Sequence, residues 1–282
     1  MKVKTKSNLY IKDLINKAKK GNTEAQRLLG VEYFEGKHVK QDFKEAERWT
    51  KKAVYKGDIQ AKANLGKIYI DMKRYKEAHK ITLEAAQEGD INAQSNLGMM
   101  YEKGYPDIQQ DYVEAVKWLS KATEHGEVEA MNNLASHYLS GIGVEKDISK
   151  AVKLLEKSSE KGYAPAQANL GLIYLTGIDG ISKDEKKAKN FILKAINNGL
   201  KEVHLYLSLA KIYEKEKDYK SAYLYYDELL KELKNNSKKP YPYHISSRGS
   251  FEKEEKDDIN DIELELIVSL ELEKLKNLIS EK

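Results

Sequence analysis

Leucine, a small residue and tyrosine recur along the chain in one fixed arrangement. Glycine or alanine follows the leucine directly, tyrosine stands four residues after it, and five of the six copies carry alanine four residues before it. Positions i, i+4, i+5 and i+8 lie on one side of an α-helix, so each copy predicts a helix with one packing face. The small residue lets a neighbouring helix approach closely, and tyrosine brings a large apolar body with a polar tip, so we expect the tyrosines in the core of the stack. Asparagine directly precedes the leucine in four copies, and we expect it to form hydrogen bonds between repeats. The copies are Leu29-Gly30-x-x-Tyr33, Leu65-Gly66-x-x-Tyr69, Leu97-Gly98-x-x-Tyr101, Leu134-Ala135-x-x-Tyr138, Leu170-Gly171-x-x-Tyr174 and Leu209-Ala210-x-x-Tyr213.

A second helical pattern follows each copy, with alanine first, an aromatic or aliphatic residue three positions later, and in most copies lysine three positions after that. A glycine closes each hairpin, where a left-handed residue can end a helix without a steric penalty. The closing glycines are 36, 32, 37, 36 and 37 residues apart, which indicates an internal repeat. They are Gly21, Gly57, Gly89, Gly126, Gly162 and Gly199.

Aspartates are placed to open the second helix of four repeats by accepting hydrogen bonds from its first turn. The second and sixth repeats lack the glycine turn that precedes these aspartates in the other copies. One such hairpin cannot bury its apolar face alone, so the copies must stack, and the fold class is all-α. The four aspartates are Asp42, Asp111, Asp147 and Asp184.

The repeat pattern predicts the organisation of the whole chain. Residues 1–22 form an N-terminal capping helix, and residues 23–234 form six repeats. Residues 235–258 hold two of the four prolines and are predicted to be a linker or a mobile loop. Residues 259–280 form a C-terminal helix that caps the stack. The repeats are about 23–57, 58–89, 90–126, 127–162, 163–199 and 200–234.

The C-terminal helix is apolar on two sides. One stripe begins at Ile259 and includes Leu266 and Leu270, and a second includes Val268 and Leu275. A helix that is apolar on most sides is buried or partnered. It therefore caps the sixth repeat, occupies the groove of the same chain as an intramolecular ligand, or forms a homodimer with a second chain.

The pattern from Ala130 to Gly162, repeated over about residues 9–233, resembles the Sel-one-like repeat family, a longer-looped relative of the tetratricopeptide repeat. The second and sixth repeats resemble plain tetratricopeptide repeats. This resemblance implies a right-handed α-solenoid of six helix-turn-helix repeats that binds other proteins, and it implies no catalytic residue. It also implies that the first helices line the concave surface.

Carried over from the related repeat, the groove positions stand two residues before and two and five residues after the conserved leucine. Several hold large apolar side chains that the framework does not require, and exposed apolar surface in a groove usually marks a binding site. The alternative is that a tight superhelix or the chain's own tail buries them. The predicted groove residues are Arg27, Val31, Phe34, Lys67, Ile70, Met99, Glu102, Asn132, Leu139, Leu172, Leu175 and Lys211.

Composition narrows the class of protein. The 282 residues include no cysteine, which excludes disulfides and thiolate chemistry. Neither a signal peptide nor a membrane span is apparent, so we expect a cytoplasmic protein, and the lysine, isoleucine and asparagine content is typical of an AT-rich bacterial genome. The net charge is +4, with 11 acidic and 5 basic residues in 251–282, hence −6 there and +10 in the remainder. Lysines interleave with acids and only four arginines are present, which disfavours nucleic acid as a partner.

No motif points to catalysis, a cofactor or a metal. The six histidines show no metal-ligand spacing. Gly141-Ile142-Gly143 follows a helix, and Lys146 stands where a dinucleotide motif needs its third glycine, so this stretch is a hairpin turn. We therefore predict a protein without enzymatic activity that binds a protein or peptide as an adaptor or scaffold. Two alternatives are an immunity or inhibitor protein that neutralises a toxin or enzyme, and a regulatory subunit autoinhibited by its C-terminal helix.

Overall fold

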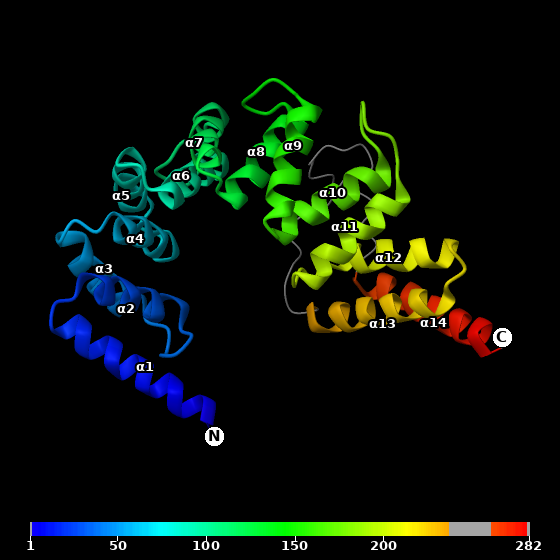
Figure 1. The fold of residues 1–282 in the computed structure, drawn as a ribbon, viewed down its shortest axis with the longest axis horizontal. Coiled ribbons are helices and arrows are strands. Elements are labelled where there is room, and N and C mark those ends of the chain that lie inside the picture. Colours follow the sequence, from blue (N-terminus) through cyan, green and yellow to red (C-terminus); the bar gives the residue numbers. More distant parts are fainter. Residues whose placement is uncertain (1, 237–260, 281–282) are drawn as a thin grey trace. The chain divides into compact units, whose positions relative to one another are not determined.

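Helices make up most of the part of the chain that is described. The computed structural model describes residues 2–236 and 261–280. These residues form fourteen α-helices and no β-strand, which confirms the all-α prediction (Figure 1). The helices are α1 (Lys2–Lys19), α2 (Thr23–Glu35), α3 (Phe43–Tyr55), α4 (Ile59–Asp71), α5 (Tyr75–Gln87), α6 (Ile91–Lys103), α7 (Tyr112–Glu124), α8 (Val128–Ser140), α9 (Ile148–Glu160), α10 (Ala164–Thr176), α11 (Glu185–Asn197), α12 (Val203–Lys215), α13 (Tyr219–Asn236) and α14 (Asp261–Ser280).

The helices are arranged in two compact units. The first unit comprises residues 1–137 and 141–145, and the second comprises residues 138–140 and 146–282. In the first unit α2–α3, α4–α5 and α6–α7 pack as hairpins, and α2, α4 and α6 contact one another in turn. In the second unit α10–α11 and α12–α13 pack as hairpins. The first helices of successive repeats in the first unit are therefore neighbours, as a stack of hairpins requires.

The aspartates and glycines that were predicted to begin and end helices do so in the structure. Side chains of Asp42, Asp111, Asp147 and Asp184 accept hydrogen bonds from backbone N–H groups in the first turns of α3, α7, α9 and α11. All six closing glycines have φ between +81° and +93°, a region that side-chain-bearing residues rarely adopt. The structure confirms both expectations.

The two turns without glycine use lysine in the same left-handed region. Lys73 (φ +59°) connects α4 to α5, and Lys217 (φ +62°) connects α12 to α13. The N–H of Lys73 donates to the carbonyl of Ile70, and the N–H of Lys217 donates to the carbonyl of Glu214. A residue with a Cβ pays a steric cost in this conformation, so the short turns store a small amount of strain.

We expect Lys73→Gly to raise the free energy of unfolding by about 1 kcal/mol, because glycine relieves this strain. Lys217→Gly should do the same in the second unit. The control is Lys80→Gly in the middle of α5, where the helical backbone suits lysine and the change should cost about 1 kcal/mol. Urea unfolding followed by circular dichroism measures all three. A loss of stability in Lys73→Gly would contradict the strained turn.

The small residue of the repeat allows two helices to approach closely, as predicted. A Cβ added to Gly98 would lie 2.7 Å from Leu119 Cγ, and one added to Gly171 would lie 2.6 Å from Ile192 Cγ1. Real Cβ atoms do not tolerate such distances, so these glycines set the spacing between α6 and α7 and between α10 and α11.

The repeated leucines form the core, whereas the repeated tyrosines do so only in part. Each of the six leucines is at most 3% exposed. Tyr69 is buried, but the other five tyrosines are half-buried. Cations cover the rings, with Arg74 Cζ 4.2 Å from the Tyr69 centroid and Lys189 Nζ 3.8 Å from that of Tyr213. A tyrosine in this repeat therefore has apolar neighbours and, in these cases, a cation–π contact as well.

The helices at both ends of the chain pack against the adjacent repeat. Ile11, Leu14 and Ala18 of α1 form one buried cluster with Leu29 and Trp49. The helix begins at Lys2, earlier than the apolar pattern from about residue 9 suggests. Its contact with α2 covers the apolar face that would otherwise be exposed at the start of the stack.

One of the two apolar stripes of α14 packs against the sixth repeat. Val268 and Leu275 are fully buried in a cluster with Tyr226 and Leu229 of α13. Leu266 and Leu270 of the other stripe are 62% and 59% exposed. The buried stripe therefore contacts α13, whereas the role of α14 as a cap and a homodimer through the exposed stripe both stay predictions. Residues 235 and 236 of the predicted linker belong to α13, and 237–258 lie outside the described residues.

Candidate functional site

The predicted groove residues of the first unit lie on the first helices of their repeats. The ring of Phe34 packs against Phe43, with centroids 5.9 Å apart. Arg27 is engaged within the fold, because its Nε lies 3.3 Å from Asp58 Oδ2. Asn132 is only 9% exposed and offers a partner little surface. Val31, Phe34, Ile70, Met99 and Glu102 are half-buried, and Lys67 is exposed.

In the second unit the structure brings two predicted groove residues together. Leu175 of α10 and Lys211 of α12 line the same open depression, which has a volume of about 340 Å³. We call it the Lys211 depression. Leu139 and Leu172 are half-buried and do not line it. Its lining residues are Leu175, Lys183, Glu185, Leu207, Ser208, Lys211, Ile212 and Lys215.

Helix periodicity and capping explain how this depression forms. Leu207, Lys211 and Lys215 stand at i, i+4 and i+8 of α12 and therefore lie along one side of that helix. Asp184 caps the start of α11, and this turn places Lys183 and Glu185 beside α12. The depression therefore combines leucines from two first helices with charges from α12 and from the start of the intervening second helix.

The charged groups around the Lys211 depression are unequally paired. Lys215 Nζ donates to both carboxylate oxygens of Glu185, at 2.7 and 2.8 Å, and Lys183 Nζ lies 3.6 Å from the same carboxylate. The hydrogen bond from Lys215 is the main cause of a lowered pKa of Glu185. Lys211 is exposed, and within the described residues it forms no ion pair. Three lysines surrounding one carboxylate leave the depression with a local charge of about +2.

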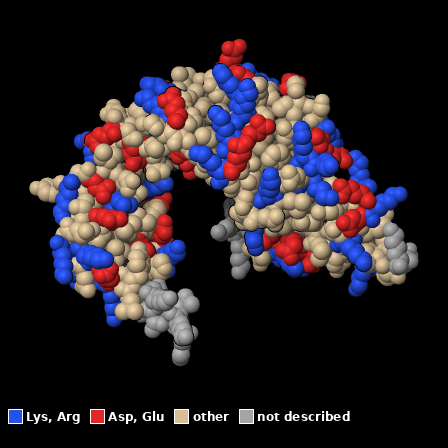
Figure 2. Space-filling view, in the orientation of Figure 1, with Lys and Arg blue, Asp and Glu red and all other residues tan. Residues whose placement is uncertain are grey.

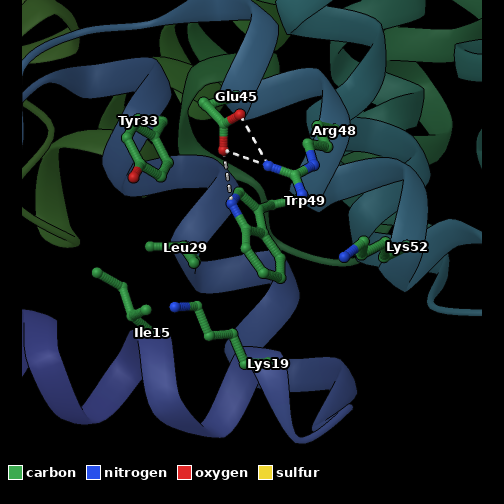
Figure 3. Close-up of a pocket in the computed structure, with 8 residues that line it drawn as sticks. All are labelled: Ile15, Lys19, Leu29, Tyr33, Glu45, Arg48, Trp49 and Lys52. Carbon is green, nitrogen blue, oxygen red and sulfur yellow. Dashed lines mark hydrogen bonds and ion pairs between the residues drawn. The ribbon is translucent and has the colours of Figure 1, made fainter.

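A second depression lies in the first unit, between α1, α2 and α3 (Figure 3). Its volume is about 360 Å³. The indole Nε1 of Trp49 donates to Glu45 Oε2 at 3.0 Å, and Arg48 donates to the same carboxylate, as Figure 3 shows. Lys52 Nζ lies 4.3 Å from the Trp49 ring centroid. This arrangement fixes the indole on one edge and covers its face with a cation.

The third repeat contains the same arrangement. Trp118 Nε1 donates to Glu114 Oε2 at 3.1 Å, Lys117 pairs with Glu114 at 2.7 Å, and Lys121 Nζ lies 4.2 Å from the Trp118 ring. Both tryptophans are almost fully buried, at 5% and 6% exposed. Because the arrangement recurs with the repeat, we interpret it as part of the packing between helices and not as a ligand site.

Glutamines link successive repeats, a role that we had expected of the asparagines before the leucine. The side-chain amides of Gln26, Gln94 and Gln167 donate to the carbonyls of Ala18, Ala86 and Ser159, at 3.1, 3.3 and 3.1 Å. Each carbonyl belongs to the last turn of the preceding second helix. By contrast, buried Asn96 Nδ2 has no hydrogen-bond partner. The recurring Ala-Gln pair at residues 25–26, 93–94 and 166–167 is the sequence signal that could have identified this bond.

Several other classes of site find no support in the described residues. No group of three His, Asp or Glu side chains there could hold a metal ion. None of the described helices has the length and apolar character that crossing a membrane requires. On the face shown in Figure 2, basic and acidic side chains are interspersed in each unit and do not form one basic field.

A family model for the Sel1 repeat matches residues 23–58, 91–127, 128–163 and 164–200, just over half of the chain. The chain belongs to the Sel1 repeat family. The matched ranges cover the helix pairs α2 and α3, α6 and α7, α8 and α9, and α10 and α11. The hairpins outside them are the two with a lysine in the short turn, α4–α5 and α12–α13. The Sel1 repeat fold is typical of modules for protein–protein interaction.

Solved structures show the same fold. A Sel1 repeat protein from Oxalobacter formigenes is 33% identical, with a TM-score of 0.66, over 75% of this chain and 89% of its own. An immunity protein from Pseudomonas aeruginosa is 17% identical, with a TM-score of 0.50, over 76% of this chain and 85% of its own. The second likeness shows the fold alone. Among curated proteins, no sequence match is found.

Proposed function

We propose that this Sel1 repeat chain is an adaptor or scaffold that binds a protein or peptide segment on the first helices of its repeats. The observation that carries the proposal is the Lys211 depression, where Leu175 and Lys211 occupy groove positions and line one open space. Leu175 is half-buried, and so is Phe34 at the equivalent position of the first repeat. Apolar side chains that are partly accessible and framed by charges suit the binding of a protein segment.

Affinity capture with the full chain, followed by mass spectrometry, tests this proposal. Leu175→Asp and Phe34→Asp place a charge at equivalent groove positions in the two units. Leu224→Asp in α13 and Val113→Asp in α7 place the same charge on second helices, at residues that are 62% and 65% exposed. We expect a captured protein to be lost with at least one groove variant and retained with both controls. Urea unfolding must show that each variant remains folded at the capture temperature.

The same capture separates the proposal from its alternatives. A captured protein that is bound equally by all four variants would overturn recognition on the first helices. A captured enzyme or toxin whose activity the chain blocks would favour the immunity role. The contact of α14 with α13 gives no support to autoinhibition by this helix, because Val268 and Leu275 face the sixth repeat.

A further inference from the structure

We propose that the Lys211 depression recognises an acidic–apolar peptide segment, in which a carboxylate pairs with Lys211 and a neighbouring apolar side chain contacts Leu175 and Leu207. This inference rests on the proposed function and specifies the chemistry of its partner. Three features of the depression support it. Part of its lining is apolar, its charged side chains carry a net positive charge, and the corresponding repeat positions of the first unit lack this combination.

The apolar part of the depression comes from two successive repeats. Leu175 is contributed by the last turn of α10 and Leu207 by the first half of α12, and both are half-buried. Ile212, which also lines the depression, is 5% exposed. The hydroxyl of Ser208 already donates to the carbonyl of His204 at 2.7 Å. A side chain that contacts the two leucines therefore meets mostly apolar surface, which favours Leu, Ile, Met or Phe in the bound segment.

The charged side chains of the depression favour an acidic residue beside the apolar residue of the bound segment. Glu185 is held by Lys215 and Lys183, so its carboxylate does not compensate Lys211. Lys211 stands one helical turn from both Leu207 and Lys215, so along α12 it lies between an apolar residue and a second cation of the depression. A carboxylate next to the apolar side chain would complete the ion pairing, whereas a basic segment would face repulsion from three lysines.

The equivalent place in the first unit lacks this combination. Phe34, Lys67 and Asp71 occupy the repeat positions of Leu175, Lys211 and Lys215. Phe34 is covered on one side by Phe43. Burial raises the pKa of the Asp90 carboxyl, and the charge of Lys67 opposes this rise only in part. Lys67 is thus an exposed lysine at the same repeat position with acidic residues nearby. The control for Lys211 is instead Lys153, an exposed lysine on the second helix α9 of the same unit that does not line the depression.

Peptide selection on the full chain tests the inference. A random twelve-residue library displayed on phage is selected on wild type, Lys211→Glu and Lys153→Glu. With wild type and Lys153→Glu, we expect enrichment of sequences that place Asp or Glu within two residues of a large apolar residue. A fluorescent peptide with the enriched sequence should bind Lys211→Glu about tenfold more weakly than wild type, and Lys153→Glu within about twofold of wild type. Replacing its acids by Gln or Asn should also weaken binding about tenfold.

Several results would overturn the inference. These are the absence of enrichment on wild type, enrichment of neutral or basic peptides, and equal weakening by the Lys211 and Lys153 substitutions. Equally tight binding of a twelve-nucleotide single-stranded DNA would instead assign the depression to nucleic acid. One further outcome separates this inference from the proposed function. If the enriched peptides contain no acidic residue and no longer bind Leu175→Asp, the acidic partner is refuted, but recognition on the first helices is not.

Discussion

Replacing Leu275 by aspartate is expected to lower the free energy of unfolding of the second unit by about 4 kcal/mol. Leu275 is fully buried between α14 and α13, in one cluster with Tyr226, Leu229 and Leu233. The change removes the apolar contact and also buries a carboxylate without a partner. Both effects are relieved if α14 leaves α13, so we expect detachment of the helix and exposure of the apolar face of α13.

Leu270→Asp is the matched control, because it makes the same change on the same helix at a side chain that is 59% exposed. It should change the free energy of unfolding by about 0.5 kcal/mol or less. Urea unfolding gives the two energies, and amide hydrogen exchange shows which helices lose protection. Equal effects of the two substitutions, or unchanged protection of α13 in Leu275→Asp, would contradict the packing of α14 as a cap.

The second large effect is expected at the glycines that set the spacing between helices. Gly98→Val should destabilise the first unit by about 3 kcal/mol. Even a Cβ at this position would lie 2.7 Å from Leu119 Cγ, 2.9 Å from Leu119 Cδ2 and 3.2 Å from the carbonyl oxygen of Ala115. Leu119 is fully buried and cannot move aside without displacing its neighbours.

A double-mutant cycle isolates this contact. Leu119→Ala alone should cost about 2–5 kcal/mol because it leaves a cavity. Combined with Gly98→Val, it should cost less than the sum of the two single changes, since the valine then occupies part of that cavity. Lys67→Val, an exposed site on α4, reports the cost of valine in a helix without a clash. Additive costs in the cycle would show that Gly98 acts through something other than its contact with Leu119.

Local features of the fold could be predicted because each depends on a few neighbouring residues. The helix caps at Asp42 and Asp184 and the left-handed closing glycines require only the backbone geometry of one turn. The leucine faces follow from helix periodicity, and the close approach at Gly98 follows from the lack of a Cβ. The family resemblance rested on the same residues.

Contacts between elements were less accessible to prediction. The glutamine bonds, such as Gln94 to the carbonyl of Ala86, depend on how one hairpin rests on the next, and the pattern alone suggested asparagine for this role. The tyrosines were expected in the core, but Tyr213 is half-buried and in contact with Lys189. A cation on an aromatic ring is decided by side chains from different helices, and no spacing within one helix reveals it.

By itself, the sequence of this Sel1 repeat chain determined the all-α class, the helical hairpins and the residues that end their helices, because these depend on interactions within one or two turns. The tertiary structure decided which stripe of α14 is buried, since both stripes are apolar and the choice depends on their packing against α13. It also decided that Leu175 and Lys211, 36 positions apart, line one depression in which Glu185 is already paired with Lys215. Such a site depends on distances between helices, which the order of residues along one helix does not contain.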